Sequence, residues 1–166
     1  MVAQSLAESQ VRLSGVPFHD IHGNISAGGR FLEKYLNLVG YTIVPDKIDF
    51  SLIYSTDIVQ CYPGKKVVGT GDNIPLSSEI ERCRTWLNQE LSLLEPQAIL
   101  LFGTPANKTF FQHYLEQKFT KLSDYYLQPS LYRDSQVLSL PHPTSMVPSK
   151  STIYQKTFEL LGQTLK

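Results

Sequence analysis

The amino-acid sequence predicts an α/β fold, a three-layer α/β/α sandwich with a central, mostly parallel four-stranded sheet. Apolar runs of strand length alternate with segments of helical period, and no repeat, charge block or low-complexity tract interrupts them. Residues 98–102 are apolar at every position, which is typical of a parallel strand covered on both faces. The chain has 166 residues, 42% of them apolar, so we expect one domain over residues 1–166.

The first third of the chain predicts two strands and one helix. A short first strand is expected to end at Val2, and a second strand is expected over residues 50–54. Residues 29–39 place apolar side chains at helical spacing, and Gly40 stands where a left-handed residue would end the helix.

A second helix is bounded by clear local signals. Ser78 and Glu81 form a capping-box pattern at its start, and Pro96 ends it. Its buried face is expected to carry Ile80, Cys83, Leu87, Leu91 and Leu94.

The last third predicts two helices around the last strand. Thr104 and Pro105 look like an N-cap and a first helical residue after the strand 98–102. Val137 to Leu140 is the last strand, and a final helix is expected over residues 150–165. Helices that join the strands favour a parallel sheet with right-handed crossovers.

Composition excludes several classes of protein. The 15 basic and 15 acidic side chains cancel, so no overall field draws the chain to nucleic acid. No segment has the length and apolarity of a membrane span, and the N-terminus lacks the pattern of a secretion signal. Two cysteines are too few for a disulfide framework. We therefore expect a cytoplasmic protein that makes no contact with a membrane.

His142 is the clearest candidate for chemistry. It follows an apolar strand directly and is flanked by Pro141 and Pro143, which restrict the backbone and hold the imidazole in few orientations. Imidazole titrates near neutrality and can supply a proton or a hydrogen bond to developing negative charge. A surface turn rich in proline would have the same sequence, and that interpretation stays open.

The loops at the carboxyl ends of the strands are the expected location of a ligand site. They follow Val2, Tyr54 and Phe102 and surround His142. These loops carry sequence motifs.

In this order, the motifs resemble the uracil-DNA glycosylase superfamily, nearest the family 4, iron-sulfur branch. The resemblance rests on residues 54–64 (YSTDIVQCYPG), 81–87 (ERCRTWL), 94–103 (LEPQAILLFG) and 140–146 (LPHPTSM). Residues 15–18 (GVPF) and 28–32 (GGRFL) are similar to the segment that follows the family's first motif. The match covers nearly the whole chain.

The resemblance implies a role for each matching position. Phe18 would stack on a base flipped out of DNA, and His142 would stabilise the departing base anion with a hydrogen bond. Met146 stands where the family has an intercalating leucine, and Thr144 and Ser145 would hold a DNA phosphate. Ordinary core packing for Phe18 and an exposed loop for Met146 are the alternatives.

The first motif departs from the family pattern because it holds no carboxylate. Gln4 could orient a water molecule but supplies no negative charge, and Ser5 beside it would contact the substrate. Asp20 is the nearest acid that could substitute, and Glu8 is a second candidate. A solvated turn residue is the alternative for Asp20.

Asp57 stands where family 4 enzymes carry an asparagine that reads uracil. Asparagine offers a donor and an acceptor, whereas an ionised carboxylate only accepts. The substitution favours a base with an amino group or a protonated Asp57. Asp57 could instead be the acid that orients water.

The resemblance also concerns a cofactor. Cys61 and Cys83 match half of a four-cysteine iron-sulfur site, so we expect no cofactor in the chain as given. The alternative is a 4Fe-4S cluster completed by a preceding Cys-x-x-Cys segment.

The resemblance implies a monomeric DNA glycosylase that removes uracil or another deaminated base by hydrolysis in base excision repair. The alternative is a catalytically degenerate member that binds a nucleobase, nucleotide or DNA without cleavage. An unrelated α/β hydrolase or nucleotide-binding domain is disfavoured because the sequence has no nucleophile elbow and no phosphate loop.

Overall fold

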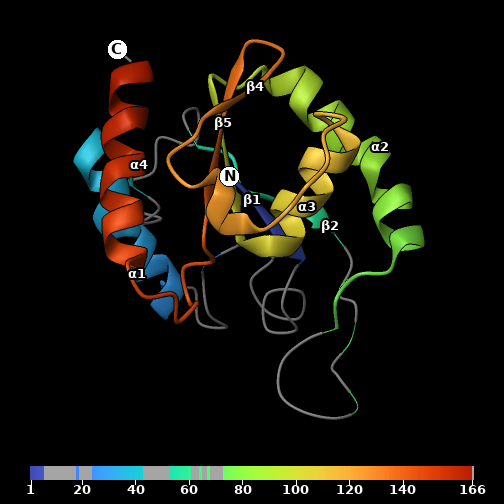
Figure 1. Ribbon diagram of the computed structural model, residues 1–166, viewed down its shortest axis with the longest axis horizontal. Helices are drawn as coiled ribbons and strands as arrows, with labels where there is room; N and C mark the ends of the chain where they lie inside the picture. The colour runs from blue at the N-terminus through green and yellow to red at the C-terminus, as the bar shows by residue number, and fades with distance from the viewer. Residues whose placement is uncertain are drawn as a thin grey trace.

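The computed structural model describes residues 1–5, 18, 24–42, 53–60, 64, 67 and 73–165. It has an α/β architecture, as the sequence predicts (Figure 1). In chain order the elements are β1 (Val2–Ser5), α1 (Ala27–Leu36), η2 (Asn37–Val39), β2 (Thr56–Val59), α2 (Ser77–Leu94), β3 (Ala98–Phe102), α3 (Gly103–His113), η4 (Leu122–Tyr125), β4 (Ser130–Tyr132), β5 (Ser135–Leu140) and α4 (Lys150–Thr164).

The described residues form a mixed sheet with the strand order β2-β1-β3-β5-β4. The pairs β2–β1, β1–β3 and β3–β5 are parallel, and β4 pairs with β5 in antiparallel orientation. The sheet therefore has five strands rather than the expected four. The sequence did not indicate β4 because it is short, lies at an edge and exposes Leu131 by 70%.

Helices pack on both faces of this sheet, α1 and α4 on one side and α2 and α3 on the other (Figure 1). Strand β3 divides its side chains between two apolar cores. Leu100 and Phe102 join the core under α1 and α4, whereas Ile99 and Leu101 join the core under α2 and α3. This alternation explains why β3 is apolar at every position and lies centrally.

Helix α1 begins and ends at local signals in the sequence. The side chain of Ser26 accepts a hydrogen bond from the backbone N–H of Gly29 at 3.1 Å. The helix continues into η2 and stops at Gly40, whose φ of +83° is the left-handed conformation expected from the sequence.

Strand β2 differs from its predicted position. Residues 53–55 lie outside any strand, and the strand begins at Thr56 instead of ending at Tyr54. Val2 of β1 pairs with Thr56, so pairing with β1 sets the start of β2. Residues 50–52 of the predicted strand lie outside the described residues. The apolar residues Ile53 and Tyr54 precede the strand, which contains the polar Thr56 and Asp57, as an edge strand can.

Two helix starts also differ from the prediction. The Glu79 carboxylate accepts a hydrogen bond from the Leu76 N–H at 2.6 Å, so Glu79, rather than Ser78 with Glu81, satisfies the start of α2. Helix α3 begins at Gly103, which places Thr104 inside the first turn rather than at the N-cap. In the part of the chain that the structure describes, no helix is long and apolar enough to cross a membrane.

Candidate active site

His142 lies just beyond the carboxyl end of β5, next to the carboxyl end of β3. Phe102 pairs with Leu140, so the residues that follow each strand leave the sheet side by side. Gly103 has a φ of +80°, and a Cβ atom placed on it would lie 3.4 Å from the His142 Cβ. The imidazole therefore occupies the edge of the sheet where α/β proteins bind ligands.

Phe18 reaches the same edge from the other end of the sequence. Its ring packs against that of Phe102 with the centroids 5.9 Å apart and the planes at 82°. Its carbonyl oxygen accepts a hydrogen bond from the Ser26 N–H at 2.7 Å, just before α1. Phe18 thus contacts the residue that precedes Gly103, the neighbour of His142.

Phe18 is also a core residue, because it is only 8% exposed and belongs to the apolar cluster under α1 and α4. Its φ of +67° is unusual for a residue with a side chain and costs free energy. The burial of Phe18 agrees with the alternative interpretation, in which it is a core residue. Its unusual backbone conformation indicates that the surrounding contacts hold it in place.

Two glycines at the start of α1 allow the chain to approach both Phe18 and the loop after His142. A Cβ atom on Gly29 would lie 2.6 Å from the Phe18 carbonyl oxygen. A Cβ atom on Gly28 would lie 3.1 Å from the Thr144 Cγ2 atom. The segment GGRFL therefore brings Phe18 and the His142 loop together.

Hydrogen bonds fix one ring nitrogen of His142. The Thr144 hydroxyl oxygen lies 2.8 Å from Nδ1, and the Thr144 backbone N–H donates to Nδ1 at 3.3 Å. Because a backbone N–H can only donate, Nδ1 acts as the acceptor, and the proton of a neutral ring resides on Nε2. The Ser145 N–H donates to the His142 carbonyl oxygen at 2.9 Å and tightens the same turn.

The environment of His142 favours the neutral ring. Burial lowers the pKa of the imidazole below its ordinary value of 6.5, and the positive charge of Lys150 lowers it further. A neutral imidazole with its proton on Nε2 can donate a hydrogen bond to a developing anion near pH 7.

Asp57 lies in β2, opposite Ala3 of β1, and not in a loop as the sequence suggested. Its side chain is buried, with the residue 5% exposed. The pKa of the carboxyl group is raised to about 7. Burial is the main cause, the negative charge of Glu90 adds to the rise, and the Met1 amino group opposes it. Asp57 therefore changes its charge near physiological pH.

Glu90 of α2 is held by hydrogen bonds from the β2 region. The Tyr54 hydroxyl donates at 3.0 Å, the Thr56 hydroxyl at 2.8 Å and the Gln60 amide at 2.6 Å. These donors keep a carboxylate near Asp57, which explains the electrostatic part of the pKa shift.

The structure places the expected DNA contacts on the loop after His142. Met146 is 95% exposed, Thr144 is exposed, and Ser145 is half-buried. The Ser145 hydroxyl oxygen is buried and has no hydrogen-bond partner among the described residues. This loop therefore presents an apolar side chain to solvent beside His142.

Gln4 and Ser5 lie at the carboxyl end of β1 and not in a loop after Val2, as the sequence suggested. Pairing with β2 extends the strand as far as Ser5. Asp20, Glu8 and Cys61 lie outside the described residues. Their expected roles stay predictions.

The two cysteines of this sequence would supply half of a four-cysteine cluster. The chain has two, and Cys83 is buried on the inner face of α2. Within the described ranges, no group of three or more histidine, cysteine or acidic side chains could hold a metal ion. The residues present therefore supply at most two of the four thiolates that such a cluster requires.

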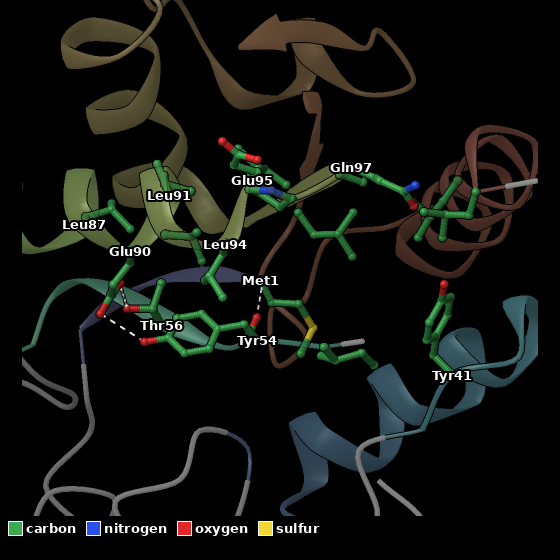
Figure 2. Close-up of a pocket in the computed structure, with 18 of the residues that line it drawn as sticks. Met1, Tyr41, Tyr54, Thr56, Leu87, Glu90, Leu91, Leu94, Glu95 and Gln97 are labelled. Atoms are coloured by element: carbon green, nitrogen blue, oxygen red, sulfur yellow. Dashed lines mark hydrogen bonds between the residues drawn. The ribbon is translucent and has the colours of Figure 1, made fainter. Parts of the chain in front are cut away.

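Figure 2 shows a cavity, whose volume is about 440 Å³. It lies at the end of the sheet where β1, β2 and β3 begin, whereas His142 lies at the opposite end. It is lined where β1, β2 and β3 begin, by Val2, Thr56 and Ala98, and by side chains of α2 that include Leu91 and Glu90. No sequence pattern indicates this cavity, because most of the residues that line it are apolar, like those of an ordinary core. It is separate from the candidate active site.

Sequence reasoning also missed Lys150 and Tyr154 of α4. The Tyr154 hydroxyl donates to the Pro141 carbonyl oxygen at 2.7 Å, and the Lys150 ammonium contacts two further carbonyls of the same loop. Their spacing of four residues puts both on one helix face, and this spacing at the start of a helix after a motif could have indicated them.

Comparisons with known proteins identify the family of this chain. The family model described as the uracil DNA glycosylase superfamily matches residues 4–166. A type-5 uracil-DNA glycosylase from Pyrobaculum aerophilum is 31% identical over 83 residues, which are 46% of this chain and 34% of that protein. The chain thus spans about a third of that relative's length. The family 4 branch noted from the motifs fits these findings, and the chain belongs to the uracil-DNA glycosylase superfamily.

Proposed function

We propose that this protein is a DNA glycosylase that flips uracil or another deaminated base out of DNA and removes it by hydrolysis in base excision repair. The observation that carries the proposal is the fixed Nδ1 of His142, which leaves the Nε2 proton for a substrate. Membership of the superfamily supports a glycosylase-like function.

His142 would act on the departing base. As the bond between the sugar carbon and the base nitrogen breaks, its electron pair moves onto the base and places negative charge on a carbonyl oxygen. The Nε2–H of a neutral imidazole would donate a hydrogen bond to that oxygen. Water then adds to the sugar carbon, and the base takes up a proton.

The acid that supports this step is part of the proposal. The sugar becomes positively charged as the bond breaks, and a carboxylate would stabilise that charge and orient the water. Asp20 is our candidate for this role, with Gln4 holding the water and Ser5 contacting the substrate.

Asp57 would read the base. With a pKa of about 7, its carboxyl group is partly protonated at neutral pH. A protonated carboxyl group offers one donor and one acceptor, as an asparagine does, and could pair with the O4 and N3–H groups of uracil. The ionised form only accepts and would favour a base with an exocyclic amino group.

The loop after His142 would contact DNA. Met146 projects into solvent and could fill the gap that a flipped base leaves, because its flexible thioether adapts to a base step. Thr144 and Ser145 would hold a phosphate, and Phe18 would form an aromatic wall of the base pocket. No cofactor takes part in this proposal for the chain as given.

A cleavage panel tests the proposal. Duplex and single-stranded DNA carrying uracil, hypoxanthine, xanthine or a thymine mismatch would be incubated with the protein and then treated with alkali to break abasic sites. We expect strand breaks at one or more of these bases, and a loss of about 100- to 1,000-fold for His142→Ala. His113→Ala is the matched control, since His113 of α3 lies against Glu81 of α2 and not in the candidate active site.

A superfamily member that binds without cleavage is the second candidate. It is favoured by Asp57, which replaces the asparagine expected from family 4. Folded protein that gives no product with any substrate, yet binds one damaged oligonucleotide more tightly than the undamaged one, would support this function and reject hydrolysis.

A further inference from the structure

The loop that carries His142 is attached to α4 by two side chains one helical turn apart. The Tyr154 hydroxyl donates to the Pro141 carbonyl oxygen at 2.7 Å. The Lys150 ammonium donates to the carbonyl oxygens of Pro143 and Ser145, each at 2.7 Å. These donors bind the carbonyl oxygens of the residue before the histidine, the residue after it and Ser145, two residues further along the loop.

The Lys150 ammonium is itself held in place from a third direction. Its nitrogen lies 4.4 Å from the centre of the Phe31 ring of α1, a distance typical of a cation–π contact. The Phe31 ring in turn packs edge-on against Tyr154, with the centroids 4.8 Å apart. Lys150 is half-buried, so solvent screens its charge less than that of a fully exposed lysine.

We infer that Lys150 is a positioning residue for His142, whose ammonium group sets the geometry of the loop through the Pro143 and Ser145 carbonyls. This inference rests on the proposed function for its catalytic consequence. The role differs from a DNA phosphate contact, because the hydrogen bonds of Lys150 go to the protein's own backbone.

A positive charge at this point also acts on the imidazole. Among the described residues, Lys150 is the charged group that shifts the pKa of His142, and it acts in the same direction as burial. The other α4 side chain at this loop, Tyr154, is neutral, because burial raises the pKa of its hydroxyl far above physiological pH. Lys150 thus favours the neutral ring while it fixes the position of the loop.

The test compares Lys150→Met with Lys150→Arg. Methionine keeps an unbranched apolar chain over Phe31 but removes the charge and both hydrogen bonds. Arginine keeps the charge, several donors and the cation–π contact. Lys156→Met is the matched control, since Lys156 is an exposed lysine on the same helix.

The first measurement is an NMR titration of the His142 ring, whose signal is assigned with His142→Gln. We expect Lys150→Met to raise the pKa of His142 and Lys150→Arg and Lys156→Met to leave it unchanged. If Lys150→Met does not fold, Lys150→Gln takes its place, because its amide keeps a donor without the charge. A folded variant with the wild-type titration would overturn the inference.

The second measurement is the single-turnover excision rate against pH. We expect Lys150→Met to lower the rate about tenfold or more, since small misplacements of a catalytic group have large effects. Its acidic limb should move to higher pH, and Lys150→Arg should restore much of the rate. An unchanged rate and pH profile would overturn the positioning role. If the wild type cleaves no substrate, the proposed function fails, and the titration alone decides the inference.

Discussion

The ring of Phe18 meets the ring of Phe102 almost at a right angle, with 5.9 Å between the centroids. The contact joins a residue from the N-terminal part of the chain to the last residue of β3. Gly103 follows Phe102 and lies against His142. A single aromatic pair therefore couples the packing of the core to the geometry of the candidate active site.

Replacing Phe18 should separate packing from base stacking. Phe18→Ala is expected to lower the free energy of unfolding by about 3 kcal/mol, because it empties a buried site. Phe18→Leu should cost less stability but still lose most stacking on a base. Urea unfolding and the excision rate measure the two effects. Excision by Phe18→Leu at the wild-type rate would leave Phe18 with a packing role alone.

Gly29→Ala should displace Phe18. The added Cβ would lie 2.6 Å from the Phe18 carbonyl oxygen, a backbone atom that cannot move independently. We expect a loss of about 1–3 kcal/mol in the free energy of unfolding. Gly162→Ala is a milder comparison, because its nearest neighbour is a Val39 side-chain atom at 3.1 Å. Equal unfolding midpoints for both variants would contradict the tight approach at Gly29.

Asp57→Asn should change base preference and its pH dependence. In the wild type, excision of uracil should fall as pH rises through about 7, because the ionised carboxyl group can no longer donate. The asparagine variant should cleave uracil at an even rate between pH 6 and 8. Rates on the same duplex at four pH values provide the measurement, and parallel profiles for the two proteins would remove Asp57 from base reading.

The same carboxyl group should make stability depend on pH. Its folded pKa of about 7 lies above the ordinary 3.8, so the folded state keeps a proton that the unfolded state releases. The free energy of unfolding therefore falls as pH rises from about 4 to about 7, by at most about 4 kcal/mol. Asp57→Asn should lack this contribution. Urea midpoints of both proteins at pH 5 and 8 test the difference.

Met146→Ala should affect duplex DNA more than single strands. A wedge matters where a flipped base leaves a gap between stacked pairs, and a single strand has no such gap. The side chain is 95% exposed, so thermal stability should not change. Uracil excision from both substrates gives the comparison. An equal loss on both substrates would contradict the wedge role.

The sequence was most informative where local signals and burial agree. Strand β3 was predicted with its observed bounds because every position faces one of two cores. Helix α4 and the loop with His142 were predicted because an apolar strand, two prolines and a helical period follow one another. These signals act over short distances along the chain.

Features set by distant contacts escaped prediction. The start of β2 depends on its pairing with β1, some fifty residues earlier, and β4 depends on pairing with β5. The raised pKa of Asp57 arises from burial and from Glu90 of α2. The interaction of Lys150 with two carbonyls needs a specific loop conformation. Neither periodicity nor composition contains this information.

Strand β5 is the only described strand with a partner of each orientation, because β3 pairs with it through five residue pairs and β4 through three. Sliding β5 by one residue would send Val137 and Leu138 each to the wrong core and break both ladders together. Pairing with β3 on one side and with β4 on the other therefore determines how far His142 lies beyond the end of the sheet. If excision takes place at this edge, the position of the His142 imidazole relative to the substrate would depend on the register of β5 more than on the conformation of the loop.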